Sequence, residues 1–314
     1  MEVTALVALL AALAFLAWSA DRFVASALEI GRILHLPKMV VGIVLVGFAT
    51  SAPELAVSVQ SSYLGHPEIA LGNALGSVLA NDGLAIALAV ILSASPILID
   101  RSVFMRAAPF ILSIDVLAYV LARDGRITRY EGGVLIALLI AYFAFVLGRT
   151  MMLLGGQDPR DSRAGLTRCV LWFSMGLAGI IAASRVIIWS AGNLAASLGI
   201  SEAIVGLTMI AVGTSLPEIA TCISAARRRE SNVVVGNIVG SDVFNILWVI
   251  GMSAAVTPIT VSTKIINFAF PWMLAIVVTM LISMRTGYRL TRPKGVLLLA
   301  MYTAYIVTAV KWFY

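Results

Sequence analysis

GIVLVGFATSAPELAVSV at residues 42–59 returns as GLTMIAVGTSLPEIATCI at residues 206–223, an offset of 164 positions. The agreement continues without a gap, because LGNALGSVLAN at residues 71–81 returns as VGNIVGSDVFN at residues 235–245. Eleven of the 40 aligned pairs in this stretch are identical, and nearly all of them are small, polar or helix-breaking residues. Chance matches in an apolar chain would be mainly Leu, Val, Ala and Ile, so the pattern indicates a duplicated polar site.

The rest of the chain has the composition of a membrane protein. Of its 314 residues, 61% are apolar and only 12% are charged, and the mean hydropathy is +1.00, which argues against a soluble globular fold. Glu2 and the lack of Lys or Arg before the first apolar run favour a first span over a cleaved signal peptide. The fold class we predict is an all-α integral membrane protein with ten transmembrane helices, at 3–30, 38–62, 69–95, 103–122, 131–153, 168–199, 203–226, 232–256, 264–285 and 293–312.

The offset of 164 also carries the first predicted span onto the sixth, so each half has five spans. Five is an odd number, and the second half must therefore insert upside down relative to the first. We expect a first repeat at 1–153, a short cytoplasmic linker at 154–167 and a second, inverted repeat at 168–314. Inverted repeats are common in secondary transporters, whose site lies near the bilayer midplane between the repeats.

The charges of the loops predict the orientation of the chain. Lys and Arg number 14 on the side that includes Lys38 and Arg228, against 5 on the side that includes both termini. The positive-inside rule then places the first side in the cytoplasm and both termini outside the cell membrane. The net charge of +6 is scattered over these loops, without the basic, aromatic-rich module of a nucleic-acid-binding protein. Cys169 and Cys222 lie in predicted spans and support neither a disulfide framework nor a zinc site.

A proline followed by a glutamate interrupts one span of each repeat. Pro53 and Pro217 lack the N–H that a helix needs, so backbone carbonyls one turn earlier are freed. Such carbonyls cannot face lipid and should line a polar cavity. Glu54 and Glu218 follow directly, near mid-membrane, and no Lys or Arg lies near them in these spans. A buried carboxylate is costly unless it is paired, protonated or bound to a metal, so we expect a cation as the partner.

Neutral oxygens extend this candidate site. Ser77 and Asn81, like Ser241 and Asn245, are four residues apart and share a helix face. An all-oxygen set of carboxylates, amides, hydroxyls and carbonyls suits Ca²⁺ and Na⁺, whereas softer metals prefer His or Cys. His35 and His66 both lie in predicted loops.

Several residues keep an alternative interpretation. Glu54 and Glu218 could instead form a structural pair that shares a proton, and each serine could be an interhelical hydrogen-bond partner. Asp82, Asp115 and Asp242 do not repeat between the halves, and their roles stay open.

At these residues the sequence resembles the cation/calcium exchanger superfamily, and within it the prokaryotic sodium/calcium exchangers. Each half carries the alpha repeat of that family, G-T-S-x-P-E followed by G-N-x-x-G-S-[ND], and the resemblance spans the whole chain. Repeat one departs from the pattern at Ala49, where Gly is usual, and at Val78, where Asn or Asp is usual. The resemblance implies a secondary active antiporter that exchanges Na⁺ for Ca²⁺ by alternating access at a midplane site.

The resemblance also implies the roles of single residues. Glu54 and Glu218 become the central Ca²⁺ ligands, joined by the backbone carbonyls of Thr50 and Thr214. One flanking Na⁺ site would use Ser77, Thr50 and the carbonyl of Gly47; the other would use Ser241, Thr214 and the carbonyl of Ala211. Asn81 and Asn245 would close the central site, and Ser51 and Ser215 match the motif. Asn245 is Asp in potassium-dependent relatives, which argues against potassium co-transport.

Three other functions are alternatives to Na⁺/Ca²⁺ exchange. A Ca²⁺/H⁺ antiporter of the same fold is the main alternative, because two neighbouring carboxylates can take up protons. An intramembrane protease would need a catalytic constellation that the spans lack, so we do not expect an enzyme. A passive channel fits matched inverted sites less well. We expect Ca²⁺ and Na⁺, and in the alternative H⁺, as transported substrates, the bilayer as surroundings, no cofactor and no obligate protein partner.

Overall fold

The structure is a computed structural model, which describes residues 2–154, 163–197 and 212–313. The first half contains α1 (Glu2–Ile33), α2 (Lys38–Val40), η1 (Val41–Gly47), α3 (Phe48–Thr50), α4 (Ala52–Tyr63), α5 (Pro67–Ala80), η2 (Asn81–Ala85), α6 (Ile86–Leu92), β1 (Ile97–Leu98), α7 (Arg101–Ala122), β2 (Arg126–Ile127) and α8 (Arg129–Leu154). The second contains α9 (Arg163–Ser197), α11 (Leu216–Arg227), α12 (Ser231–Val243), η3 (Phe244–Ile250), α13 (Gly251–Val256), β3 (Ile259–Thr260), η4 (Ile265–Ala269), α14 (Phe270–Arg285), η5 (Thr286–Tyr288), β4 (Arg289–Leu290) and α15 (Arg292–Phe313).

The helices are those of a membrane protein. Among the described residues, eight helices are long and apolar enough to cross a bilayer, and a bent pair, Lys38–Thr50 with Ala52–Tyr63, makes up to nine. The all-helical membrane class is therefore confirmed. The seventh predicted span, 203–226, is described only from residue 212 onward, so the count of ten helices in two repeats stays a prediction.

The helix boundaries differ from the predicted ones by a few residues. The largest shift is at α9, which begins at Arg163 although the linker was expected to extend to residue 167. Residues 163–167 (RAGLT) directly follow a charged stretch and include Arg163, Gly165 and Thr167, so hydropathy alone does not mark the start of the helix there. The predicted interruption at Pro53 is confirmed, because the chain bends by 41° between Thr50 and Ala52.

The helices form a buried centre and an exposed periphery. In the most apolar window of Pro67–Leu92, 78% of residues are buried, and in that of Ser231–Val256 the share is 94%. The other six spans that consist of a single described helix reach at most 33%. These two central spans carry the duplicated G-N-x-x-G-S motifs, so the polar residues of the sequence lie at the middle of the fold.

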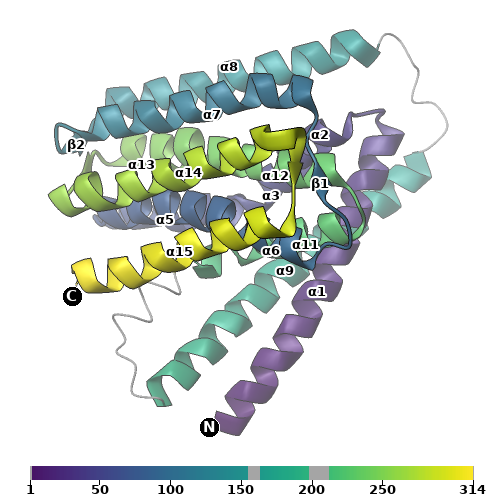
Figure 1. Cartoon of the computed structure of the whole chain (residues 1–314), viewed down its shortest axis with the longest axis horizontal. Coiled ribbons are helices and arrows are strands. Elements are labelled where there is room, and N and C mark those ends of the chain that lie inside the picture. Colours follow the sequence, from purple (N-terminus) through teal and green to yellow (C-terminus); the bar gives the residue numbers. More distant parts are fainter. Residues whose placement is uncertain (1, 155–162, 198–211, 314) are drawn as a thin grey trace.

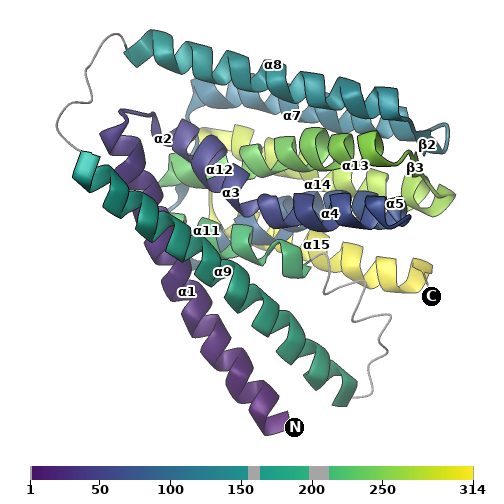
Figure 2. The same cartoon turned by 180° about the vertical axis from the view of Figure 1, so that it is seen from behind.

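Two long helices stand apart from this body. α1 and α9 pack side by side along their length and extend obliquely away from the other helices (Figures 1 and 2). Because each is the first helix of its half, the pair joins the two repeats.

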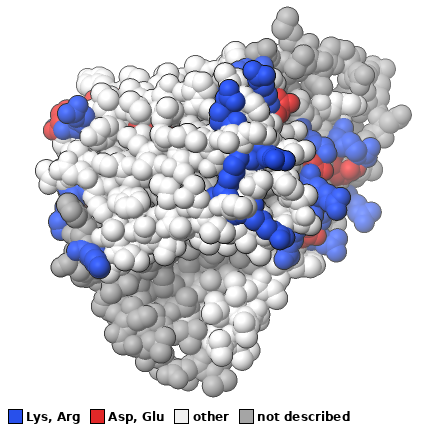
Figure 3. All heavy atoms as spheres, viewed as in Figure 1, with Lys and Arg blue, Asp and Glu red and all other residues white. Residues whose placement is uncertain are grey.

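Two short antiparallel ribbons join the repeats elsewhere. β1 pairs with β4 through Ile97 and Leu290, and β2 pairs with β3 through Ile127 and Ile259. Lys and Arg side chains gather at the end of the molecule near α2 and β1, with fewer at the other end (Figure 3). We call the end that carries Lys38, Arg101 and Arg228 the basic end, and the end that carries Tyr63 the opposite end.

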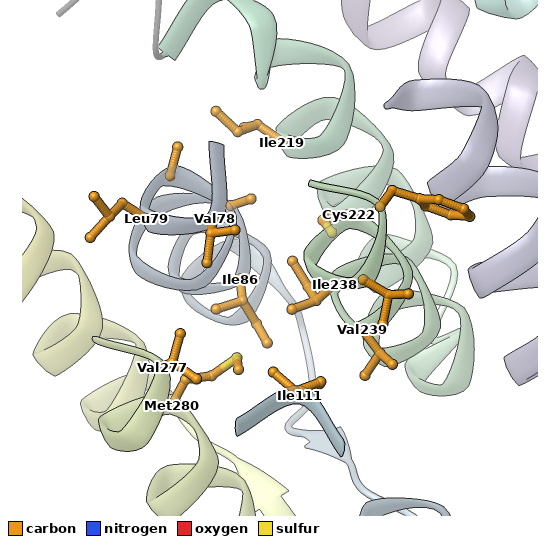
Figure 4. Packing of buried hydrophobic residues seen from close by; sticks show 14 of the residues in the cluster. Val78, Leu79, Ile86, Ile111, Ile219, Cys222, Ile238, Val239, Val277 and Met280 are labelled. Atoms are coloured by element: carbon orange, nitrogen blue, oxygen red, sulfur yellow. The ribbon is translucent and has the colours of Figure 1, made fainter. Parts of the chain in front are cut away.

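Apolar packing holds the central spans together. Val78 and Ile86 of the first repeat lie against Ile238 of α12, with Val277 and Met280 of α14 beneath them (Figure 4). The same two spans widen into π-helical turns, η2 beginning at Asn81 and η3 containing Asn245. Such turns occur frequently at functional sites, and here both begin within a turn of a candidate ligand.

Candidate functional site

The two Pro-Glu motifs begin two helices of opposite repeats. α4 starts at Ala52 after the break at Ser51, and α11 starts at Leu216 after Ser215. In each, the proline stands in the first turn, where its missing N–H is not needed. The glutamate therefore also stands in the first turn, where the positive end of the helix dipole favours a carboxylate.

The two glutamates meet in the interior. Glu54 and Glu218 are both 0% exposed, and their carboxyl groups are close enough to interact directly with each other. Among the described residues, both carboxylate oxygens of Glu54 and Oε2 of Glu218 have no hydrogen-bond partner. No described salt bridge involves either glutamate. Two buried acids without a basic partner need a cation or a proton between them.

Hydroxyl groups of one repeat reach across to the other. Ser51 Oγ donates to Glu218 Oε1 at 3.3 Å, and Ser77 Oγ lies 3.5 Å from Thr214 Oγ1. Both contacts cross between the repeats, so polar side chains of one half face the broken helix of the other. The grouping of Ser77 with Thr50 at one Na⁺ site stays a prediction, because a contact between two hydroxyl groups does not show where an ion binds.

The second half shows the same crossing in its backbone. A Cβ placed on Gly47 would lie 3.4 Å from Gly240 Cα, so the residue before Ser241 packs on the first repeat. Gly42 and Gly236 approach even more closely, because a Cβ on Gly42 would be 2.9 Å from Gly236 Cα. Glycine is required where two helix backbones touch in this way.

The amides predicted to close the site are fully buried. Asn81 and Asn245 are 0% exposed, and neither their Oδ1 nor their Nδ2 atoms have a partner among the described residues. Ser215 Oγ and Ser241 Oγ are buried and unpartnered in the same sense. Buried polar groups in native proteins are almost always satisfied, so this concentration of unsatisfied oxygens marks a place for ions or water.

Of the other predicted ligands, two already make hydrogen bonds within the protein, and one is not described by the structure. The carbonyl of Gly47 already accepts bonds from Ser51 N at 3.0 Å and from Thr50 Oγ1 at 3.3 Å. Thr50 Oγ1 also donates to Val46 O at 3.0 Å. Ala211 lies outside the described residues.

Two polar residues were not assigned a role from the sequence. Asn73 donates to Ser58 Oγ at 2.9 Å and accepts from Thr214 Oγ1 at 3.0 Å. Asn237 donates to Thr221 Oγ1 and to Cys222 Sγ, each at 3.2 Å. The signal that could have found them is their identity at equivalent positions of both repeats.

Three aspartates form a separate acidic group beside this site. Asp82, Asp115 and Asp242 are each 0% exposed, and their carboxyl groups interact with one another. The sequence left the roles of all three aspartates open and did not predict that they lie together. No group of three or more His, Cys, Asp or Glu side chains in the described part of the chain is arranged to hold a metal, so the candidate site relies on two carboxylates and neutral oxygens.

Known proteins share both the sequence and the fold. A family described as "Sodium/calcium exchanger protein" matches residues 4–148 and 169–311, which are the two halves of the chain. The chain is 32% identical to the "Putative antiporter CaxA" of Alkalimonas amylolytica over 94% of this chain and 95% of that protein. It is 30% identical to the "Sodium/calcium exchanger MaX1" of Methanosarcina acetivorans over 95% and 96%. It is also 35% identical to the "Inner membrane protein YrbG" of Escherichia coli over 80% and 79%.

A solved structure agrees with these matches. The sodium-calcium exchanger NCX_Mj, soaked with 10 mM Na⁺ and zero Ca²⁺, superimposes with a TM-score of 0.85 at 26% identity, over 98% of this chain and 99% of that one. The matches point to a transporter rather than an enzyme. They confirm the resemblance seen in the repeated motifs, and the chain belongs to the sodium/calcium exchanger protein family, as a prokaryotic type of the cation/calcium exchanger superfamily.

Proposed function

We propose that this protein is a secondary active antiporter that exchanges Na⁺ for Ca²⁺ across a cell membrane by alternating access. The observation that carries the proposal is the pair Glu54 and Glu218, one from each repeat, buried together without a basic partner. Two relatives, named as an antiporter and as a sodium/calcium exchanger, support the same activity.

The charge of the pair explains how the two ions compete. One Ca²⁺ neutralises two carboxylates, and the neutral oxygens of Asn81, Asn245 and the repeated hydroxyls complete the 6–8 ligands that this ion prefers. Several Na⁺ ions can balance the same charge, with Ser77, Thr50 and the carbonyl of Gly47 at one flanking site and with Ser241 and Thr214 at the other. An empty site keeps two uncompensated charges in a low dielectric, which opposes its passage across the membrane and couples the two fluxes.

The orientation of the protein belongs to the same proposal. The basic end faces the cytoplasm, because Lys and Arg are retained on that side, and both termini are then extracellular. The basic end is also where α1 is tied to α11, since Arg228 forms a two-point ion pair with Asp21 at 2.6 and 2.9 Å.

Uptake of radioactive Ca²⁺ into proteoliposomes tests the activity. Vesicles loaded with Na⁺ or with choline, at one internal pH and with or without an outward proton gradient, separate the two couplings on one preparation. Uptake that needs internal Na⁺ and ignores the proton gradient is the expected result. Uptake in choline driven by protons would replace the proposal with Ca²⁺/H⁺ antiport at the same two glutamates.

A further inference from the structure

Asn73 and Asn237 hold equivalent positions in the two repeats and make the same contact through their amide nitrogens. Nδ2 of Asn73 donates to Ser58 Oγ at 2.9 Å, and Nδ2 of Asn237 donates to Cys222 Sγ at 3.2 Å. Ser58 and Cys222 are themselves 164 residues apart. Each asparagine therefore ties its own helix, α5 or α12, to the helix that begins with the Pro-Glu motif of the same repeat.

The amide oxygens of the two asparagines behave differently. Oδ1 of Asn73 accepts a hydrogen bond from Thr214 Oγ1 of the other repeat at 3.0 Å. Oδ1 of Asn237 is buried and has no partner among the described residues. The hydroxyl that is equivalent to Thr214 belongs to Thr50, and it donates to its own helix instead, at the carbonyls of Val46 and Gly47.

Two further pairs share this asymmetry. Ser77 Oγ lies 3.5 Å from Thr214 Oγ1, whereas Ser241 Oγ has no partner in the described part of the chain. Ser51 Oγ donates to Glu218 Oε1, whereas Ser215 Oγ likewise has none. These serines, threonines, glutamates and asparagines are identical in the two repeats. The difference is therefore one of conformation and not of composition.

We propose that Asn73 and Asn237 are positioning residues that act in turn during alternating access. In one access state Asn73 accepts the hydrogen bond of Thr214, and in the other Asn237 accepts the hydrogen bond of Thr50. Inverted repeats exchange conformations between the states of an alternating-access cycle. A buried acceptor without a partner is unfavourable, and the exchange satisfies Asn237 Oδ1 when Thr50 turns toward it. The inference rests on the alternating access of the proposed function, and the ions transported do not enter it.

The two bonds act on different halves of the pathway. Thr214 precedes Glu218 on a helix that runs toward the basic end, so the Asn73–Thr214 bond lies on the side of the opposite end. Thr50 lies on the basic-end side of Glu54 by the same reasoning. In the state described here, the Asn73–Thr214 bond is made on the side of the opposite end, and the Asn237–Thr50 bond is absent on the side of the basic end. In the other access state, the Asn237–Thr50 bond is made and the Asn73–Thr214 bond is absent.

Hydrogen–deuterium exchange of the whole protein in lipid nanodiscs, without Ca²⁺, tests the proposal. Asn73→Ala should disfavour the state described here, and exchange in residues 231–243 should fall because Asn237 then holds Thr50 more often. Asn237→Ala should lower exchange in residues 67–80 for the reciprocal reason. The expected change is on the order of fivefold, the population shift that one hydrogen bond of typical net strength produces.

The diagnostic quantity is the exchange of the helix in the other repeat, since a local structural defect can only raise exchange near the mutated residue. In the double variant Asn73→Ala/Asn237→Ala, the exchange of both helices should return toward the wild-type values. Two independent structural defects would instead raise the exchange of both helices. Asn232→Ala serves as the control, because Asn232 is an exposed asparagine at the start of α12 and should leave residues 67–80 unchanged.

Serine variants at positions 73 and 237 keep the test open if an alanine variant does not fold. Serine retains a small polar group but is too short to reach the threonine, so the same reciprocal changes are expected. Unchanged or raised exchange in the other repeat's helix, in both single variants, would overturn the proposal. This outcome is distinct from failure of the proposed function, which would appear as a wild-type protein without Na⁺-driven Ca²⁺ uptake.

Discussion

The two repeats carry the same polar residues in different surroundings. Gly236 of the second repeat is pressed against the first, because a Cβ there would lie 2.6 Å from Met39 O. Gly72, its equivalent in the first repeat, is exposed and has no described atom within 4 Å of such a Cβ. Identical sequence thus supplies identical chemistry, while the packing around it differs between the halves.

The repeats differ in sequence at their ends. Asp21 and Arg228 form an ion pair at 2.6 Å, but the equivalent positions hold Arg185 and Leu64. Asp100 caps α7 through Ser102 N and Val103 N, whereas its equivalent is Lys264, which makes no side-chain cap. The shared residues lie at the centre, and these unshared ones make the two ends of the molecule unlike each other.

The largest effect should come from the two shared glutamates. Glu54→Gln and Glu218→Gln each remove one of two charged ligands, so Ca²⁺ uptake into proteoliposomes should fall by more than about 100-fold. This loss is larger than that expected when a residue that only supports a metal ligand is changed. The losses should be equal, because the chemistry of the two positions is the same.

Glu68→Gln is the matched control for this charge change. Glu68 is an exposed glutamate in the first turn of α5, and its uptake should equal that of the wild type. A large loss in one glutamine variant with normal uptake in the other would show that the repeats do not share one site.

The next effect concerns the glycine pair. Gly236→Ala forces α12 away from η1 and should lower the free energy of unfolding by about 2 kcal/mol. Gly72→Ala meets no described neighbour and should leave stability unchanged or raise it by up to about 1 kcal/mol, because alanine favours a helix. Thermal unfolding in detergent compares them. Equal destabilisation by both substitutions would mean that the two repeats are packed alike.

A smaller effect is expected at the ion pair of the basic end. Arg228→Gln removes the two-point contact with Asp21, whose side chain is 54% exposed, so the free energy of unfolding should fall by less than about 1 kcal/mol. The difference from wild type should shrink in high salt, because exposed charges are screened. Arg227→Gln is the control on the same turn. A loss that does not depend on salt would point to packing rather than charge.

The smallest effect should come from the cap of α7. Hydrogen bonds from Ser102 and from Val103 N hold the pKa of Asp100 below its ordinary value of 3.8. A lowered pKa stabilises the fold above the pKa of the unfolded chain, and this contribution is lost as pH falls through the folded value. Asp100→Ala should therefore cost about 0.5 kcal/mol at neutral pH, and less in strong acid, where the part that depends on ionisation is lost. A deficit of the same size at neutral and at low pH would exclude the ionised form of the cap as its cause.

Much of the fold was predictable because duplication and hydropathy are both visible in the chain. The offset of 164 identified the central helices and the break at Pro53, and the membrane class followed from composition. The helix starts were harder to predict, since α9 begins at Arg163, directly after a charged stretch that hydropathy assigns to a loop.

The chemistry of the candidate site was more predictable than its pairing. Glu54 and Glu218 stand out because a buried acid after a proline is rare without a purpose. The contact of Ser77 with Thr214 across the repeats was not predicted, because a linear pattern does not show that the repeats interlock. The π-helical turns at Asn81 and Asn245 were also missed, because the extra residue per turn depends on packing around the helix.

Calcium binding at equilibrium tests the central claim most directly, namely that one site is built from both repeats. Isothermal titration of the purified protein in Na⁺-free buffer measures the number of Ca²⁺ ions bound per chain, with Glu54→Gln and Glu218→Gln titrated in parallel. A single Ca²⁺ per wild-type chain and none in either variant is the predicted result. Two Ca²⁺ per chain, with one retained in each variant, would mean that each repeat holds its own ion and would contradict the shared site.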